Sequence, residues 1–192
     1  MKHVVKSALL SAALVMAGAA ASFAATVDFT GAGEQGGGSY TEDGLVFDDI
    51  RIVNGNCDSA SGRPCGALND NETSTLTQVG GGTFTLSSFW YQLLGNGNPN
   101  TLTVMSDLGG LLTFASDVVG HNDDGHTVDL TGLALFQNIS SLTFSTTDGG
   151  NVRIDDLVLA GTGPSEVPLP AGGLLLLGGL GALAAFRRRK QA

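Results

Sequence analysis

Cys57 and Cys65 are the two cysteines of this 192-residue chain, and seven residues separate them. The segment between them is polar and contains Gly62 and Pro64. A catalytic thiol would stand unpaired beside a histidine. In an exported chain, two close cysteines instead form a disulfide. We therefore predict a Cys57–Cys65 disulfide that pins a long loop between strands.

Asp155 and Asp156 interrupt an apolar segment that otherwise has the pattern of a strand. Adjacent residues of a strand point to opposite faces, so one of the two carboxylates should point inward. An enclosed carboxylate needs hydrogen-bond donors or a cation. Donors from loop amides are the first expectation. The alternative is Ca²⁺, the one cofactor that we consider, with further oxygen ligands from Glu42, Asp43 or Asp28.

His121 and His126 frame an acidic segment, Asn122-Asp123-Asp124-Gly125. Imidazole and carboxylate groups this close could bind a transition metal. The spacing is that of a turn, however, and the sequence offers no third or fourth ligand. A solvated hairpin turn is the interpretation that we favour.

Phe89, Trp90 and Tyr91 are consecutive, so they cannot all face one side of a strand. One interpretation places Trp90 or Tyr91 outside the core, where an aromatic face could stack on a sugar ring. The other places two rings in the core and the third under a loop, and we favour it.

An enzyme that acts on polysaccharide is a further alternative, but the sequence gives it little support: paired carboxylates are plentiful, and any acidic domain has them. The sequence contains no nucleophile elbow, no P-loop and no zinc-protease motif. Neither His121 nor His126 lies near an evident nucleophile. We therefore expect a protein that is not an enzyme.

Short alternating segments separated by turn residues must position these side chains. Gly, Asn and Asp cluster in the breaks, for example at residues 36–38, 80–82 and 96–100. Candidate strands cover residues 26–30, 44–53, 83–94, 101–104, 111–118, 128–130, 141–145 and 151–159. About eight strands at this spacing, without an amphipathic helix, predict an all-β domain, a β-sandwich or jelly roll, over residues 25–161.

Charge is distributed unevenly along the chain. All 18 acidic residues lie between Asp28 and Glu166, where Arg51, Arg63 and Arg153 are the basic residues, so the middle part carries 3 − 18 = −15. Nucleic acid and anionic membranes should be repelled by such a domain. We therefore expect no nucleic-acid partner.

The N-terminus has the features of a signal peptide over residues 1–24. Lys2 and Lys6 supply the positive region, and residues 8–21 are apolar. Ser22-Phe23-Ala24 places small residues at the positions that signal peptidase reads, so cleavage should follow Ala24. The alternative is an uncleaved anchor. Export implies the Sec machinery and signal peptidase as partners.

The C-terminus combines a proline motif, an apolar segment and a basic cluster, after a linker at residues 162–166. The motif is Val167-Pro168-Leu169-Pro170-Ala171, and the apolar segment covers residues 172–186. Arg187-Arg188-Arg189-Lys190 follows as a positive stop. Residues 167–186 are just long enough to cross a bilayer core, and the basic cluster should stay cytoplasmic. A plain tail anchor is the alternative.

This order of motif, helix and basic cluster resembles the PEP-CTERM sorting signal, in its VPLPA variant, over residues 167–192. The resemblance implies that an exosortase, a membrane cysteine transpeptidase-like enzyme, recognises the motif and processes the tail. A proline pair replaces the more usual Pro-Glu-Pro, which leaves the exosortase subtype open. The family occurs in Gram-negative bacteria that make exopolysaccharide.

The middle part resembles the jelly-roll domains of PEP-CTERM proteins and of extracellular carbohydrate-binding modules. Residues 40–45, 84–88 and 154–159 carry this resemblance. We expect an exported, surface-sorted, non-catalytic protein of the cell envelope or exopolysaccharide matrix. It would be held transiently in the inner membrane with its domain in the periplasm. The alternative is a lectin-like carbohydrate-binding module, with or without calcium.

Overall fold

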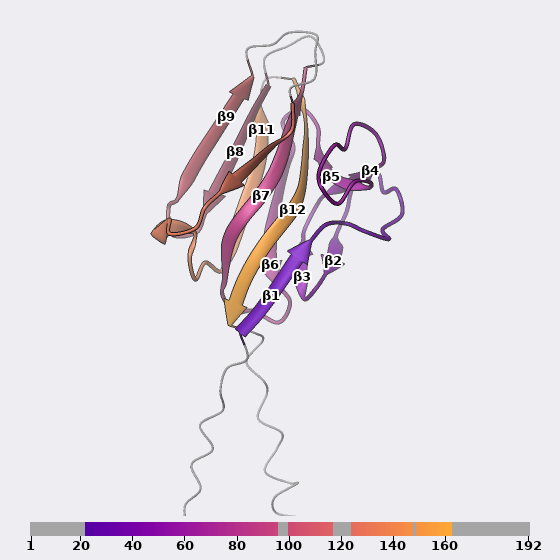
Figure 1. Ribbon diagram of the computed structural model, residues 1–192. Helices are drawn as coiled ribbons and strands as arrows, with labels where there is room; N and C mark the ends of the chain where they lie inside the picture. Colours follow the sequence, from indigo (N-terminus) through magenta and orange to yellow (C-terminus); the bar gives the residue numbers. More distant parts are fainter. Residues whose placement is uncertain (1–21, 96–99, 117–123, 148, 163–192) are drawn as a thin grey trace, which may run out of the picture.

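The computed structural model describes residues 22–95, 100–116, 124–147 and 149–162. Over these residues the chain is all-β: two antiparallel sheets pack face to face (Figure 1). The predicted signal peptide up to residue 21, the predicted sorting motif, the basic cluster and His121 lie outside the described residues. None of the helical segments within the described ranges is long and apolar enough to span a membrane.

Sheet A contains the strands that carry the disulfide and the adjacent aspartates. Its order is β10 (His126–Asp129), β7 (Phe84–Leu94), β12 (Asn151–Thr162), β5 (Cys65–Leu68) and β4 (Arg51–Val53), and β1 (Ser22–Val27) also pairs with β12. The strand β12 is therefore shared: β5 pairs with residues 152–154, and β1 pairs with residues 157–162.

Sheet B has the order β2 (Tyr40–Glu42), β3 (Leu45–Phe47), β6 (Thr73–Gln78), β11 (Ser141–Thr147), β8 (Asn100–Ser106) and β9 (Leu111–Ser116). Its central neighbours are far apart in the chain, because β11 lies between β6 and β8. A short 3₁₀ helix, η1 (Ala134–Phe136), precedes β11.

The core lies between the two sheets and follows from the period-two pattern of the strands. In β7, Phe89, Tyr91 and Leu93 alternate toward the core, and in β11 Leu142 and Phe144 do the same. Side chains of a strand alternate between faces, so apolar residues at every second position bury one face of each sheet. The predicted β-sandwich is confirmed in this respect.

The predicted single strand over residues 44–53 is wrong. The chain forms β3 in sheet B, leaves it at Asp48, and enters sheet A as β4 at Arg51. The Asp48 carboxylate accepts hydrogen bonds from the backbone amides of Asp49 (2.8 Å) and Thr75 (2.6 Å). This side chain replaces a ladder bond where the chain turns from one sheet to the other. Three further strands, β2, β5 and β6, had no counterpart in the predicted set.

The two ends of the described chain lie side by side at one end of the sandwich (Figure 1). Ser22 pairs with Thr162 and Ala24 pairs with Ala160 in the antiparallel β1–β12 ladder. The residues expected to form the signal-peptidase site, Ser22-Phe23-Ala24, are thus part of a strand in the uncleaved chain. The segments on either side of the domain therefore begin at neighbouring points.

Candidate functional site

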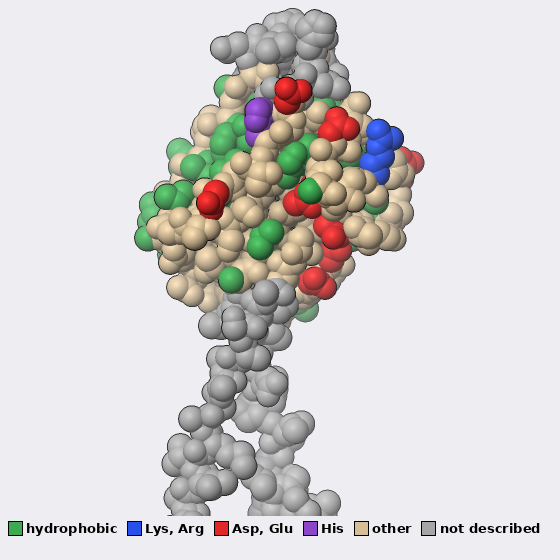
Figure 2. Space-filling model, in the orientation of Figure 1, with side chains coloured by type: hydrophobic (Ala, Val, Ile, Leu, Met, Phe, Trp, Pro, Cys, Tyr) green, Lys and Arg blue, Asp and Glu red, His purple; other side chains and the backbone are tan. Residues whose placement is uncertain are grey.

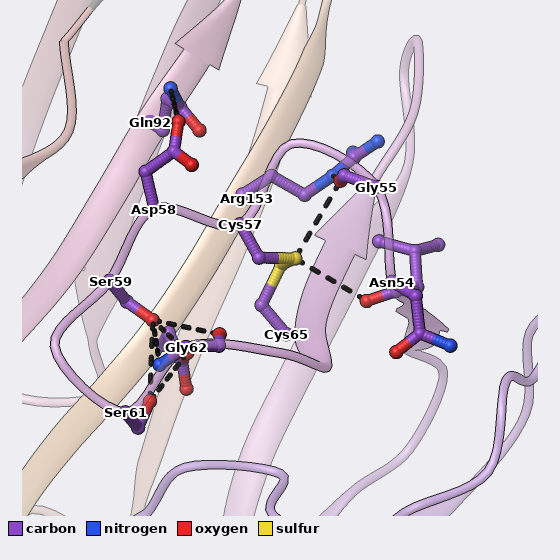
Figure 3. The surroundings of a disulfide bond; sticks show 12 residues. Asn54, Gly55, Cys57, Asp58, Ser59, Ser61, Gly62, Cys65, Gln92 and Arg153 are labelled. Carbon is purple, nitrogen blue, oxygen red and sulfur yellow. Dashed lines mark hydrogen bonds between the residues drawn. A yellow bond between two sulfur atoms is a disulfide. The ribbon is translucent and has the colours of Figure 1, made fainter.

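The disulfide loop, residues 54–64, covers the outer face of sheet A. Cys57 and Cys65 form the predicted disulfide, with Cα atoms 5.9 Å apart, so this prediction is confirmed. The backbone carbonyl of Gly55 accepts a hydrogen bond from Arg153 of β12 (3.1 Å), and Asp58 accepts one from Gln92 of β7 (3.3 Å). Figure 3 shows the loop lying over these strands, and the two hydrogen bonds hold its first half against them.

Asp155 is fully buried, at 0% exposure, but it does not point into the core between the sheets. Its neighbours Ile154 and Leu157 face that core, and Asp155 lies on the opposite face, under the disulfide loop. The hydroxyls of Ser59 (2.5 Å) and Ser61 (2.9 Å) donate to its carboxylate. Figure 3 shows these two serines side by side in the loop.

Burial raises the pKa of Asp155 to about 7, although the donors around it favour the ionised form. Besides the two serines, the backbone amide of Asp156 donates to the carboxylate (2.9 Å). Removing water disfavours the charged form of a carboxyl group more than these three donors stabilise it. The disulfide loop is therefore hydrogen-bonded to a carboxyl group whose pKa lies near neutral pH.

Asp156 occupies a β-bulge in β12 and has a positive φ of 48°. The bulge lies where β12 changes partner from β5 to β1, and it turns the two carboxylates to different partners. The Asp156 carboxylate accepts the backbone amide of Ala60, at 2.9 Å. The two aspartates thus hold three consecutive loop residues, 59–61.

The other carboxylates proposed as calcium ligands have different partners. Glu42 accepts the backbone amide of Phe29 (3.0 Å), and burial raises its pKa. Asp28 accepts the amide of Thr30, and Asp43 lies in the β2–β3 turn with a φ of 46°. Within the described ranges, no group of three or more His, Cys, Asp or Glu side chains could hold a metal ion. The enclosed Asp155 does have hydrogen-bond donors from the loop, but they are serine hydroxyls and not the loop amides that were the first expectation. A loop amide, that of Ala60, donates to Asp156.

The proposed stacking role of Trp90 and Tyr91 is wrong, because both side chains are buried. Trp90 is 4% exposed and Tyr91 is 8% exposed, so neither ring offers a face to a ligand. Tyr91 packs in the core against Phe114. Trp90 lies on the outer side of sheet A, where Gly125 approaches so closely that an added methyl group would collide with the indole. Two rings in the core and one beneath a loop was the interpretation that we favoured.

His126 is exposed and lies on the side of β10 that faces Tyr91, with ring centroids 5.6 Å apart. It pairs in register with Tyr91, so its side chain shares the core side of sheet A. Ser59 and Asp155 lie on the other side of that sheet. The described residues therefore do not bring a histidine to this serine–aspartate pair.

The outer face of sheet B presents exposed or half-buried side chains of a single chemical character. We call it the hydroxyl face. It consists of the outward side chains of six strands: Thr41, Val46, Thr73, Thr75, Thr77, Ser141, Thr143, Ser145, Thr147, Thr101, Thr103, Met105, Leu111, Thr113 and Ala115. Eleven of these fifteen residues carry a hydroxyl group and none carries a charge.

The strand register aligns these hydroxyl groups in rows. Thr75 lies opposite Thr143, and their hydroxyl oxygens are 3.4 Å apart. A second row contains Thr73, Ser145, Thr103 and Thr113. Adjacent strands are about 4.8 Å apart and successive outward residues about 6.8 Å apart, so the face is a two-dimensional array of hydroxyl groups and methyl groups.

Sequence reasoning missed this face, although its signal is visible in the sequence. Thr or Ser occupies every second position at 73–77, 101–103 and 141–145. The sequence analysis used these Thr and Ser residues only as the polar positions of alternating strands and assigned them no function. Only the strand order places the three repeats side by side.

Comparison with known proteins returns no matching family model and no matching curated protein. Among solved structures, TmCBM61 in complex with beta-1,4-galactotriose is similar at 13% identity and a TM-score of 0.34, over 69% of this chain and 92% of that one. The K3 cleaved adhesin domain of Lys-gingipain from Porphyromonas gingivalis has 15% identity and a TM-score of 0.42, over 71% and 98%. A family 29 carbohydrate-binding module has 14% identity and a TM-score of 0.35, over 72% and 88%.

Proposed function

We propose that this chain is an exported, non-catalytic protein of the cell envelope or exopolysaccharide matrix, and that its β-sandwich binds neutral polysaccharide through the hydroxyl face. The observation that carries the proposal is the lack of charge on this face. The middle part of the chain has a net charge of −15, yet fifteen outward residues on six strands carry none. Acidic residues that were merely distributed for solubility would not avoid one whole face.

The chemistry of the face matches that of a neutral glycan. Each hydroxyl group both donates and accepts hydrogen bonds, as sugar hydroxyls do. The Thr methyl groups, together with Val46, Met105 and Leu111, give apolar contact area for the C–H faces of sugar rings. Threonine is β-branched and stiff, so ordering it on binding costs little side-chain entropy.

The charge of the domain indicates whether the bound polysaccharide is neutral or anionic. The acidic remainder of the domain repels a polyanion at long range, and the face offers no Lys or Arg to bind a carboxylate or sulfate group. A neutral chain meets no such repulsion. The proposed ligand class is therefore an uncharged polysaccharide.

The proposal assigns no catalytic role to the enclosed serines. Ser59 and Ser61 donate to Asp155, and no histidine within the described ranges lies on that side of sheet A. A serine without a base is a weak nucleophile. The hydrogen bonds from Ser59 and Ser61 to Asp155 hold the disulfide loop on sheet A.

Export and sorting complete the proposal and rest on the terminal segments alone. The Sec machinery and signal peptidase would act at the N-terminus. An exosortase would act at Val167-Pro168-Leu169-Pro170-Ala171. The polysaccharide that the domain binds would then be the matrix in which the processed protein is retained.

The experiment compares binding of the full chain, purified in detergent, to beads of insoluble neutral polysaccharides and to an anionic polysaccharide. Thr143→Glu places a charge at the centre of the hydroxyl face. Thr127→Glu makes the same change on exposed β10 of sheet A and is the matched control. We expect Thr143→Glu to weaken binding to a neutral polysaccharide at least tenfold and Thr127→Glu to change it less than twofold. Equal effects of the two variants, or no binding to any neutral polysaccharide, would show that the proposal is wrong.

A further inference from the structure

The strand β9 forms one edge of sheet B and lacks the features that usually protect such an edge. It pairs with β8 along six consecutive residues without a bulge, and no strand in the described ranges pairs with its other side. Its sequence, Leu111-Leu112-Thr113-Phe114-Ala115-Ser116, contains no charge and no proline. Edge strands are normally shortened, charged or bulged because their free backbone groups pair with other strands.

Three of the other described edges do carry such protection. The opposite edge of sheet B, β2, has three residues and ends at Glu42. In sheet A, the four-residue edge strand β10 ends at Asp129. The other edge strand, β4, is covered in part by a bridge between Gln35 and Ile52. The remaining edge strand, β1 of sheet A, pairs with β12 alone within the described ranges and is also uncharged. The β9 edge differs from it in the exposed Leu111 and Met105 beside it.

Apolar side chains surround this edge. Leu111 is 61% exposed and lies opposite Met105, which is 48% exposed. Leu108 in the β8–β9 turn and Leu135 in η1 are also exposed, and the Ser106 hydroxyl donates to the Leu135 carbonyl, which holds η1 against this turn. Figure 2 shows hydrophobic side chains along this edge, at the left of the view. Exposed apolar groups that gather in one place mark an interaction surface.

We propose that β9 pairs antiparallel with β9 of a second copy of this chain. A strand added here must place apolar side chains toward the core, where Leu112 and Phe114 are only partly buried, and uncharged side chains outward. The sequence of β9 has this pattern itself. When Leu112 lies opposite Phe114 of the second copy, Thr113 lies opposite its equivalent and all side chains keep their faces.

The negative charge of the domain restricts where a second copy can dock. Two domains that each carry 3 − 17 = −14 over residues 25–161 repel each other, and the contact would therefore use the uncharged edge. At physiological ionic strength the repulsion is screened within about 8 Å, so it does not prevent contact at β9. If the hydroxyl face binds polysaccharide as proposed above, pairing of the two edges would make one continuous face from both copies.

Cross-linking in cells tests this pairing on the full chain. Thr113→Cys is placed on β9 and Thr75→Cys on β6, in the middle of the same face, as the control. Cells that export each variant are treated with a short bismaleimide and analysed by electrophoresis. We expect a product of twice the chain mass for Thr113→Cys and at most a tenth as much for Thr75→Cys. Equal yields, no product, or a product of another mass would overturn the proposal.

A second pair of variants distinguishes strand pairing from chance collision. Leu111→Lys, added to Thr113→Cys, places a charge on the edge and should lower the dimer yield at least fivefold. Thr41→Lys makes the same charge change on the opposite edge strand β2 and should leave the yield unchanged. A yield that Leu111→Lys does not lower would overturn the proposal. Polysaccharide binding is measured separately on the same variants, so failure of the pairing and failure of the proposed function are distinguishable.

Discussion

Asp155→Asn should stabilise the folded domain at pH 8 and leave its stability almost unchanged near pH 4. The carboxyl group is fully buried under the disulfide loop, and burial raises its pKa from 3.8 to about 7. Between these values the folded chain holds a proton that the unfolded chain has lost. The free energy of unfolding therefore falls as pH rises from about 4 to about 7 and levels off above that range.

The size of the effect follows from the difference in pKa. Each unit corresponds to 1.36 kcal/mol, so a difference of about three units gives a ceiling of about 4 kcal/mol at pH 8. Asparagine has nearly the same shape and stays neutral, and its amide oxygen can still accept from Ser59 and Ser61. The amide nitrogen cannot accept a hydrogen bond as the carboxylate oxygen in its place does, so part of this ceiling is lost. We therefore expect the free energy of unfolding to increase by about 2–4 kcal/mol at pH 8.

The assay is urea unfolding of the wild type and the variant between pH 4.5 and 8.5. Trp90, the single tryptophan of the chain, lies opposite Asp155 on β7 and reports on this region by fluorescence. The quantity to plot is the difference in unfolding free energy between the two proteins against pH. It should increase from pH 4.5 to about 7 in favour of Asp155→Asn.

Asp129→Asn is the matched control because its pH dependence should have the opposite sign. The Thr131 hydroxyl and amide hold the pKa of Asp129 below its usual value. A lowered pKa contributes stability above 3.8 that is lost as pH falls, so this variant should lose stability at pH 8 and not at low pH. If Asp155→Asn is instead less stable than the wild type at pH 8, the serine donors outweigh burial and the reasoning is refuted.

Three further predictions concern the disulfide, calcium and the tail. Replacing Cys57 and Cys65 together with Ser should lower the free energy of unfolding by about 2.5 kcal/mol, as measured in urea, because an eight-residue loop is no longer closed in the unfolded chain. Unchanged stability would contradict it. The melting temperature should be the same in excess calcium and in excess chelator, since Asp155 already has its donors; a drop of several degrees on chelation would restore the calcium interpretation. Replacing Pro168 and Pro170 with Ala should leave an unprocessed, membrane-held chain, and an identical mature C-terminus by mass spectrometry would refute the sorting motif.

Much of the fold could be predicted from local pattern. The alternation in Phe84–Leu94 and Ser141–Thr147 defines buried strands, because a period of two places every second side chain on one face. The disulfide also followed from the sequence, since two close cysteines in a chain that we expect to be exported have one partner each. The split of residues 44–53 between two sheets could not be predicted, because Asp48 ends the strand by binding the amide of Thr75, 27 residues away.

The two sites were decided by pairing over long distances. The sequence shows that Asp155 and Asp156 interrupt an apolar strand, but only the tertiary structure brings Ser59 to Asp155, across 96 residues. The same holds for the hydroxyl face. Alternating Thr and Ser residues on β6, β8 and β11 are visible one strand at a time, and their union depends on β11 entering between β6 and β8. Periodicity fixes which face of a strand a residue occupies, whereas the neighbour across the ladder depends on the packing of the whole chain.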